Sequence, residues 1–206
     1  MIGVVTLSPL TARAAHAPLR TGSAPQARSR RAAVIFAIVA LLAGCSAAQR
    51  APDFTLIDDS GHAWTLSAQH GHPVLLTFGF THCSDTCPET LAKLAHLTRG
   101  LGLFGAKVEV VMVSVDPQRD TRRVLHRFVQ RFDGPIVGLT GSPARVARVE
   151  SDYHVWAQRI PGRRGKSYDV AHSAVIYVIA ANGQIRAVAN DDDSEATLAA
   201  TMRPLL

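Results

Sequence analysis

The amino-acid sequence predicts an α/β fold in which helices flank a central mixed β-sheet. Two observations support this fold class: continuous apolar segments alternate with helical patterns along the chain, and the last helix follows a hairpin. The composition agrees, because 206 residues that are 47% hydrophobic and 18% charged can bury a core. No internal repeat or second linker is visible, so we expect one domain over residues 52–206.

The first half of this domain is expected to contain a hairpin, two buried strands and a helix between them. The hairpin joins the short segments 53–57 and 63–66 through a glycine turn. Segments 74–80 and 108–115 are continuous apolar runs, which are typical of strands buried on both faces. Between them, Pro88 fits the first turn of a helix with one apolar face, formed by Leu91, Leu94, Ala95 and Thr98.

The second half continues the alternation. Asp120 is expected to cap a helix, a short strand follows at 136–139, and Ser142 opens a further helix. Strands at 173–180 and 184–189 should pair across a three-residue turn that resembles type I′. Either of two residues can cap the last helix, Asp193 or Ser194.

Residues 1–44 have the composition of an export signal. Five of the 22 basic residues and none of the 16 acidic ones lie there, so the rest of the chain has a net charge of only +1. That near-neutral remainder carries no electrostatic signature of nucleic-acid binding. The apolar run 32–43 has twelve residues, fewer than the about 20 that a membrane-spanning helix needs. It therefore fits the hydrophobic region of a signal peptide.

The signal ends in Leu42-Ala43-Gly44-Cys45, which resembles the bacterial lipobox, whose cysteine is acylated and becomes the mature N-terminus. The resemblance implies a lipoprotein signal peptide over 1–44 and an acylated N-terminus with a short linker over 45–51. It also implies a periplasm-facing domain that a lipid anchor holds on a membrane of the bacterial cell envelope. The alternative is an ordinary signal peptide followed by an incidental cysteine.

Cys83 and Cys87 lie between a buried strand and a helix, where α/β sheets bind their ligands. The N-terminus of a helix favours thiolates, and thiolates are soft ligands that suit Cu(I). Three intervening residues let the two sulfur atoms reach one metal ion or each other, so a metal site and a redox-active pair both remain open. A purely structural disulfide would close too small a loop to stabilise the fold much.

A third metal ligand would come from one of the histidines. His172 stands out because it precedes an apolar strand whose entrance can lie beside the cysteine loop. His82 is adjacent to Cys83, but neighbouring side chains of an extended segment point to opposite sides, so we expect it to support the site without binding metal. Six other histidines have no ligand spacing and are expected to be exposed: His62, His70, His72, His96, His126 and His154.

Three segments, taken together and in this order, resemble the Sco/SenC family: 81–88 (THCSDTCP), 114–121 (SVDPQRDT) and 168–173 (YDVAHS). The resemblance spans about residues 52–202. It implies a thioredoxin-like fold and a copper chaperone for cytochrome c oxidase assembly, with Cu(I) or Cu(II) bound by Cys83, Cys87 and His172.

The chain departs from the family pattern at two places. Ala171 stands where an aspartate usually precedes the ligand histidine, and the loop 161–166 is short. Two aspartates match family positions, Asp116 and Asp120, although a turn at the end of a strand and a helix cap would account for them as well.

Two functions therefore compete for the cysteine pair. The first is a metallochaperone that delivers copper to the binuclear copper site of the copper-bearing subunit of cytochrome c oxidase. The second is a thiol–disulfide oxidoreductase that reduces the cysteines of that subunit, with Cys83 or Cys87 as the attacking thiolate. Another periplasmic copper chaperone or a thiol reductase is a further expected partner. His172 discriminates between the two functions, because only the chaperone needs it as a ligand.

Overall fold

The computed structural model of the protein describes residues 49–162 and 167–206. The expected signal peptide, the acylation site at Cys45 and most of the short loop 161–166 lie outside the described residues. Within these two ranges, no helix is long and apolar enough to span a bilayer.

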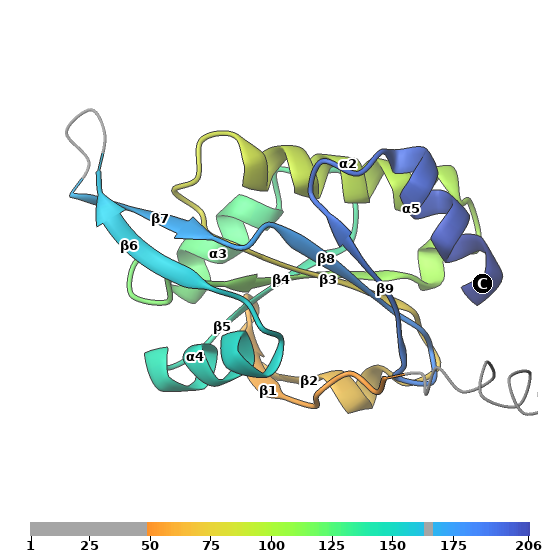
Figure 1. The fold of residues 1–206 in the computed structure, drawn as a ribbon, viewed down its shortest axis with the longest axis horizontal. Coiled ribbons are helices and arrows are strands. Elements are labelled where there is room, and N and C mark those ends of the chain that lie inside the picture. The colour runs from red at the N-terminus through yellow and green to blue at the C-terminus, as the bar shows by residue number, and fades with distance from the viewer. Residues whose placement is uncertain (1–48, 163–166) are drawn as a thin grey trace, which may run out of the picture. The chain divides into compact units, whose positions relative to one another are not determined.

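A seven-stranded mixed sheet forms the centre of the domain, in the order β2-β1-β5-β4-β3-β8-β9 (Figure 1). Strands β3, β4 and β5 run parallel, and the remaining neighbours pair antiparallel. The strands are β1 (Thr55–Asp58), β2 (Ala63–Thr65), β3 (Val74–Gly79), β4 (Glu109–Ser114), β5 (Ile136–Thr140), β8 (Val175–Ile179) and β9 (Ile185–Asn190). The predicted α/β fold with a mixed sheet is confirmed.

The three most apolar runs of the sequence are inner strands, as predicted. All six residues of β3 are buried, as are five of the six in β4. Strand β8 pairs with β3 on one side and with β9 on the other. Full burial on both faces explains why these segments read as continuous apolar runs and not as an alternation.

Helices cover both faces of the sheet (Figure 1). The helices are α2 (Thr86–Gly100), α3 (Arg122–Val129), α4 (Pro143–Asp152) and α5 (Glu195–Met202), with 3₁₀ turns η1 (Leu66–Gln69), η2 (Gly105–Lys107) and η3 (Arg203–Leu205). The apolar residues of α2, α3 and α5 pack in one core with Leu75, Val110 and Met112 of the sheet. Helix α4 packs in a second core, with Leu76 and Val111 on the opposite face.

Two local predictions were wrong. Asp120 does not cap α3; the cap is Thr121, whose hydroxyl accepts the backbone N–H of Val124. The carboxylate of Asp120 is unavailable for capping because it is fully buried in other hydrogen bonds. The β8–β9 turn is not type I′, which needs a positive φ at two residues. Only Gly183 has one there (φ +78°), as in a three-residue turn that ends in a glycine bulge.

The sequence analysis also missed a separate two-stranded sheet, formed by β6 (Ala157–Pro161) and β7 (Tyr168–His172). Its strands lack a clear apolar alternation, because four of the five residues of β6 are exposed. The segment 168–173 was expected only as the entrance to the next strand. In the structure it is mostly strand β7 itself, and the last residue of β7 is His172.

Candidate metal centre

The two cysteines lie where β3 ends and α2 begins. Cys87 is in the first turn of α2 and is only 4% exposed, whereas Cys83 precedes the helix and is half-buried. The Sγ atom of Cys83 accepts the backbone N–H of Cys87 at 3.3 Å. The first N–H groups of a helix have no partner within the helix, so they stabilise a thiolate at this position.

A glycine at the end of β3 leaves room for the second cysteine. A Cβ atom at Gly79 would lie 3.2 Å from Cys87 Sγ and 3.2 Å from Met112 Sδ. Either neighbour would have to move by a few tenths of an ångström to admit it. The glycine therefore lets the α2 cysteine pack directly against the sheet.

His172 reaches the cysteines from 85 residues further along the chain. Its Nε2 atom lies 3.7 Å from Cys87 Sγ. Its Nδ1 atom is 2.9 Å from the carbonyl oxygen of Ser173. Because a carbonyl oxygen only accepts, Nδ1 carries the proton and the lone pair of Nε2 faces the sulfur. The ring also packs edge-on against Phe80, with the ring centroids 5.8 Å apart.

The structure thus brings Cys83, Cys87 and His172 into one cluster. Within the described ranges, no three His, Cys, Asp or Glu side chains are already arranged to hold a metal ion. A shared ion would therefore require the three donor side chains to reorient, and Cys83 Sγ would have to give up or share its contact with the Cys87 backbone N–H.

The two thiols have opposite acidities. The hydrogen bond with Cys87 lowers the pKa of Cys83 to about 6, and the backbone N–H groups of Cys87 and Asp85 act in the same direction against the effect of burial. The hydrogen bond with Cys83 and burial both raise the pKa of Cys87. In the reduced pair, Cys83 is therefore the thiolate and Cys87 holds the proton.

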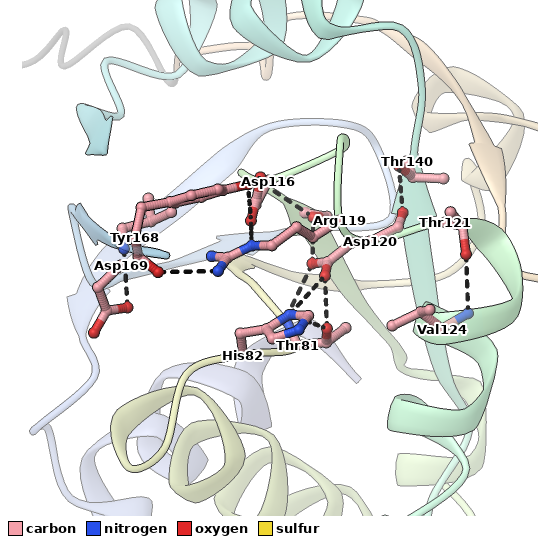
Figure 2. Close-up of polar contacts among 12 residues, drawn as sticks. Thr81, His82, Asp116, Arg119, Asp120, Thr121, Val124, Thr140, Tyr168 and Asp169 are labelled. Atoms are coloured by element: carbon pink, nitrogen blue, oxygen red, sulfur yellow. Dashed lines mark hydrogen bonds and ion pairs between the residues drawn. The ribbon is translucent and has the colours of Figure 1, made fainter. Parts of the chain in front are cut away.

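A buried carboxylate fixes the start of the cysteine loop. Asp120 is 0% exposed and accepts hydrogen bonds from the Thr81 backbone N–H (3.0 Å), the Thr81 hydroxyl (2.6 Å) and the Ser114 hydroxyl (2.6 Å). His82 lies beside it, with Nδ1 3.8 Å from a carboxylate oxygen of Asp120 and 3.2 Å from Thr81 Oγ1 (Figure 2). Asp120 thereby ties the loop to the loop that follows β4.

A second buried carboxylate holds β7, the strand that ends in His172. Asp116 is 1% exposed and accepts the Tyr168 hydroxyl at 2.8 Å and the Arg119 guanidinium (Figure 2). The guanidinium of Arg119 also stacks on the Tyr168 ring at 3.7 Å and donates to the Tyr168 carbonyl at 3.0 Å. Arg159 of β6 approaches Asp116 at 3.6 Å. We call Asp116, Arg119 and Tyr168 the β7 clamp.

An open pocket of about 350 Å³ adjoins Cys83 and His172. Its wall includes the half-exposed ring of Trp156 and three carboxylates, those of Asp85, Asp169 and Asp191. The cysteine and histidine side chains can therefore be approached from solvent at an acidic surface.

The structure brings the three residues expected as ligands together, and it adds side chains around them that were not expected. The six histidines without ligand spacing are exposed, as predicted. Asp116 and Asp120 match family positions, but a turn and a helix cap account for them in the sequence, and the Tyr168–Arg119 contact is not expected from it. A usable signal was the pair of aspartates four residues apart just after a mostly buried strand, since acidic residues there must find partners when they are buried.

Comparisons with known proteins agree with this geometry. The SCO1/SenC family model matches residues 44–206. The mitochondrial SCO2 homolog of Bos taurus is 39% identical over 135 residues, which are 64% of this chain and 50% of that protein. The chain spans about half the length of the curated relatives it matches.

Two solved structures with bound copper have the same fold. Bradyrhizobium japonicum ScoI with copper bound has a TM-score of 0.69 and 34% identity, covering 76% of this chain and 99% of that one. Yeast Sco1 with copper bound has a TM-score of 0.68 and 27% identity, covering 76% of this chain and 87% of that one. The fold is thus that of the Sco proteins, the thioredoxin-like fold expected from the motifs.

Proposed function

Because the chain belongs to the SCO1/SenC family, we propose that it is a copper chaperone that is held on a membrane through Cys45. Cys83, Cys87 and His172 bind the copper as cargo. The chaperone delivers it to the binuclear copper site in the copper-bearing subunit of cytochrome c oxidase. Copper bound in the ScoI and Sco1 relatives supports the choice of metal.

The observation that carries this proposal is the position of His172 beside Cys87. The imidazole, whose Nε2 lone pair faces a sulfur at 3.7 Å, completes a donor set of two sulfurs and one nitrogen, which a dithiol reductase does not require. Such a set suits Cu(I) in three-coordinate geometry and, with an added ligand, Cu(II). The carbonyl of Ser173 orients the ring, as outer partners commonly do for histidine ligands of metals.

Transfer to a partner needs donors that can be reached and exchanged. The half-buried Cys83 lines the open pocket together with His172, while Cys87 is buried beneath them. Incoming ligands of the oxidase subunit would displace the accessible donors first and the buried sulfur last. A periplasmic copper chaperone or a thiol reductase that prepares this site would approach from the same side.

The second candidate function is thiol–disulfide exchange, and the acidity of the pair favours it. The Cys83 thiolate would attack a disulfide of the oxidase subunit, and one client sulfur would leave as a thiolate and take up a proton. Cys87 would then lose its proton and attack Cys83, which releases the reduced client and leaves a Cys83–Cys87 disulfide. An external thiol reductant would have to return the pair to its reduced form.

His172→Ala separates the two functions. Two sulfurs can still hold Cu(I) in linear geometry, so Cu(I) affinity should fall only in part, whereas Cu(II) absorption should fall much further. Redox cycling of Cys83 and Cys87 should survive the same change. His72→Ala, at an exposed histidine outside the site, is the matched control and should change none of these properties.

The same variant can be tested for oxidase assembly in cells. If the His172→Ala variant no longer supports oxidase assembly but its cysteines still cycle between dithiol and disulfide, copper delivery is supported. Unaltered Cu(II) binding would exclude His172 as a ligand and favour the reductase.

A further inference from the structure

The chain enters the described domain at the end of the sheet opposite the cysteines. Gln49 accepts the backbone N–H of Ile185 at 2.8 Å, and Ala51 donates to Gly183 at 2.9 Å, so both lie at the β8–β9 turn. Strands β3 and β4 begin at this same end, because Val74 pairs with Glu109 and with Ile179. We call it the anchor end; it is the right-hand end of Figure 1.

The position of Cys45 ties the anchor end to the membrane. Only residues 46–48 separate Cys45 from Gln49. Four Cα–Cα steps span at most about 14 Å when fully extended. An acylated Cys45 therefore keeps Gln49, where the chain enters the anchor end, within about 14 Å of the acylated residue, whichever path the linker takes.

The anchor end exposes large apolar side chains. Leu103 is 88% exposed and Phe104 is 57% exposed, in the loop that leads from α2 into the first residue of β4. Leu206, 38% exposed, lies at the same end of the domain, after α5 (Figure 1). Single exposed apolar residues are ordinary, but two adjacent ones at a loop tip, at the end of the domain where the chain enters, form a surface that lipid can cover.

The charged residues also differ between the anchor end and the opposite end of the domain. Four exposed basic residues lie at the anchor end: Arg50, Lys107, Arg186 and Arg203. Three acidic residues lie there too: Asp133 pairs with Arg99, Glu109 accepts the Trp64 indole N–H, and the exposed Asp53 accepts the Ser67 hydroxyl.

The opposite end carries a cluster of carboxylates around the pocket and the β9–α5 turn: Asp85, Asp169, Asp191, Asp192 and Asp193. Exposed arginines also lie at this opposite end, among them Arg122, Arg123 and Arg145. The orientation is therefore favoured by attraction of the basic residues at the anchor end to an anionic membrane surface, and not by repulsion of the other end.

We infer that the anchor end is a lipid-binding surface, with Leu103 and Phe104 inserted among the lipids and the basic residues facing the headgroups. This inference rests on the proposed acylation of Cys45. It fixes the orientation of the domain, because β3 then runs away from the membrane. Its six residues place the cysteine–histidine cluster about 20 Å further out, turned toward soluble or protruding parts of a partner.

The test uses the full chain, matured in a bacterial membrane and reconstituted in vesicles that contain anionic phosphatidylglycerol. Phe104→Trp introduces an indole at the loop tip, and lipids with brominated acyl chains quench indoles that they touch. Val188→Trp is the matched control, because Val188 is 55% exposed but lies within β9 and away from the loop. The native Trp64 and Trp156 contribute a constant background that wild-type protein measures.

We expect the indole at position 104 to emit at shorter wavelength and to lose at least half of its intensity in brominated vesicles. The indole at position 188 should lose almost none. If both indoles are quenched weakly and equally in protein that floats with the vesicles, the proposed orientation is wrong, but the proposed lipid anchor is not contradicted. Protein that does not float with the vesicles would overturn both. Leu103→Trp repeats the measurement at the most exposed position if Phe104→Trp folds poorly.

Discussion

At the scale of single residues, the hydrogen bond between the two thiols determines which cysteine is ionised. Cys83 has a lowered pKa chiefly because Cys87 donates to it, and the raised pKa of Cys87 is the other half of the same contact. Because of this difference in pKa, Cys83 is already a thiolate, a soft anionic ligand, before a metal ion binds. The same difference would equally prepare an attacking thiolate, so acidity alone does not distinguish a chaperone from a reductase.

The pH dependence of Cys83 alkylation tests this arrangement in the reduced, metal-free protein. Only the thiolate reacts, so the rate should fall to half of its plateau at about pH 6 and should be near the plateau at pH 7. Cys87→Ala removes the donor and should move the midpoint upward, whereas Cys87→Ser keeps a hydroxyl donor and should move it less. The rate is read by mass spectrometry of the Cys83 peptide. A wild-type midpoint near 8.5, the ordinary value for a thiol, would contradict the proposed hydrogen bond.

At the scale of elements, the position of His172 depends on how β7 is held. Strand β7 pairs only with the exposed β6, so the main sheet does not fix it through its hydrogen bonds. The β7 clamp supplies the missing connection, from Asp116 and Arg119 after β4 to Tyr168 at the start of β7. His172 follows Tyr168 by four residues along β7 and lies beside Cys87.

Tyr168→Phe tests the clamp. The phenyl ring can still stack on Arg119, but the buried Asp116 carboxylate loses a hydrogen bond, so the free energy of unfolding should fall by about 1.5–3 kcal/mol. Because β7 is loosened, Cu(II) absorption should weaken as well.

Tyr153→Phe is the control for this prediction. Its hydroxyl donates to the Pro52 carbonyl at 2.8 Å, in the core on the α4 side of the sheet. It should lower stability by about 1 kcal/mol, the usual value for a neutral hydrogen bond, without changing the copper spectrum. Chemical denaturation gives the stabilities. Equal spectral changes in both variants would mean that Tyr168 acts on stability alone.

At the scale of the whole molecule, the cysteine–histidine cluster and the anchor end lie at opposite ends of the central strands. The cysteine loop follows the carboxyl end of β3, and the chain enters at the amino end of the same strand. The proposed lipid anchor and the proposed copper site are therefore separated by the length of the sheet, and each should tolerate loss of the other.

Cys45→Ser tests this independence. The substitution removes the thiol that is acylated, so labelled palmitate should no longer enter the protein, and lipoprotein processing should stop. Copper binding by the domain should remain within experimental error of wild type, because the metal centre lies at the far end of the fold. Incorporation of palmitate into the Cys45→Ser protein would contradict the lipobox interpretation. Membrane retention is not a sufficient readout, since an uncleaved apolar run 32–43 can itself hold the chain there.

Local patterns in the sequence determined most of the main sheet and its helices. Apolar runs marked β3, β4 and β8 because burial on both faces leaves a continuous signature. Caps such as Ser142 and Ser194 marked helix starts because a hydroxyl satisfies backbone N–H groups a few residues away. The spacing of Cys83 and Cys87 likewise belongs to a single loop. Position alone made His172 a candidate third ligand, and the resemblance of several motifs to the Sco/SenC family strengthened that prediction.

Only the tertiary structure decided which side chains support the cluster. Asp120 had the position of a helix cap, but burial beside Thr81 and Ser114 gave its carboxylate stronger partners than a helix end offers. The β6–β7 pair had no apolar signature because one of its strands faces solvent. The 3.7 Å approach of His172 to Cys87 joins residues 85 positions apart. Such a contact depends on the order of the strands in the sheet, and no local pattern of residues encodes that order.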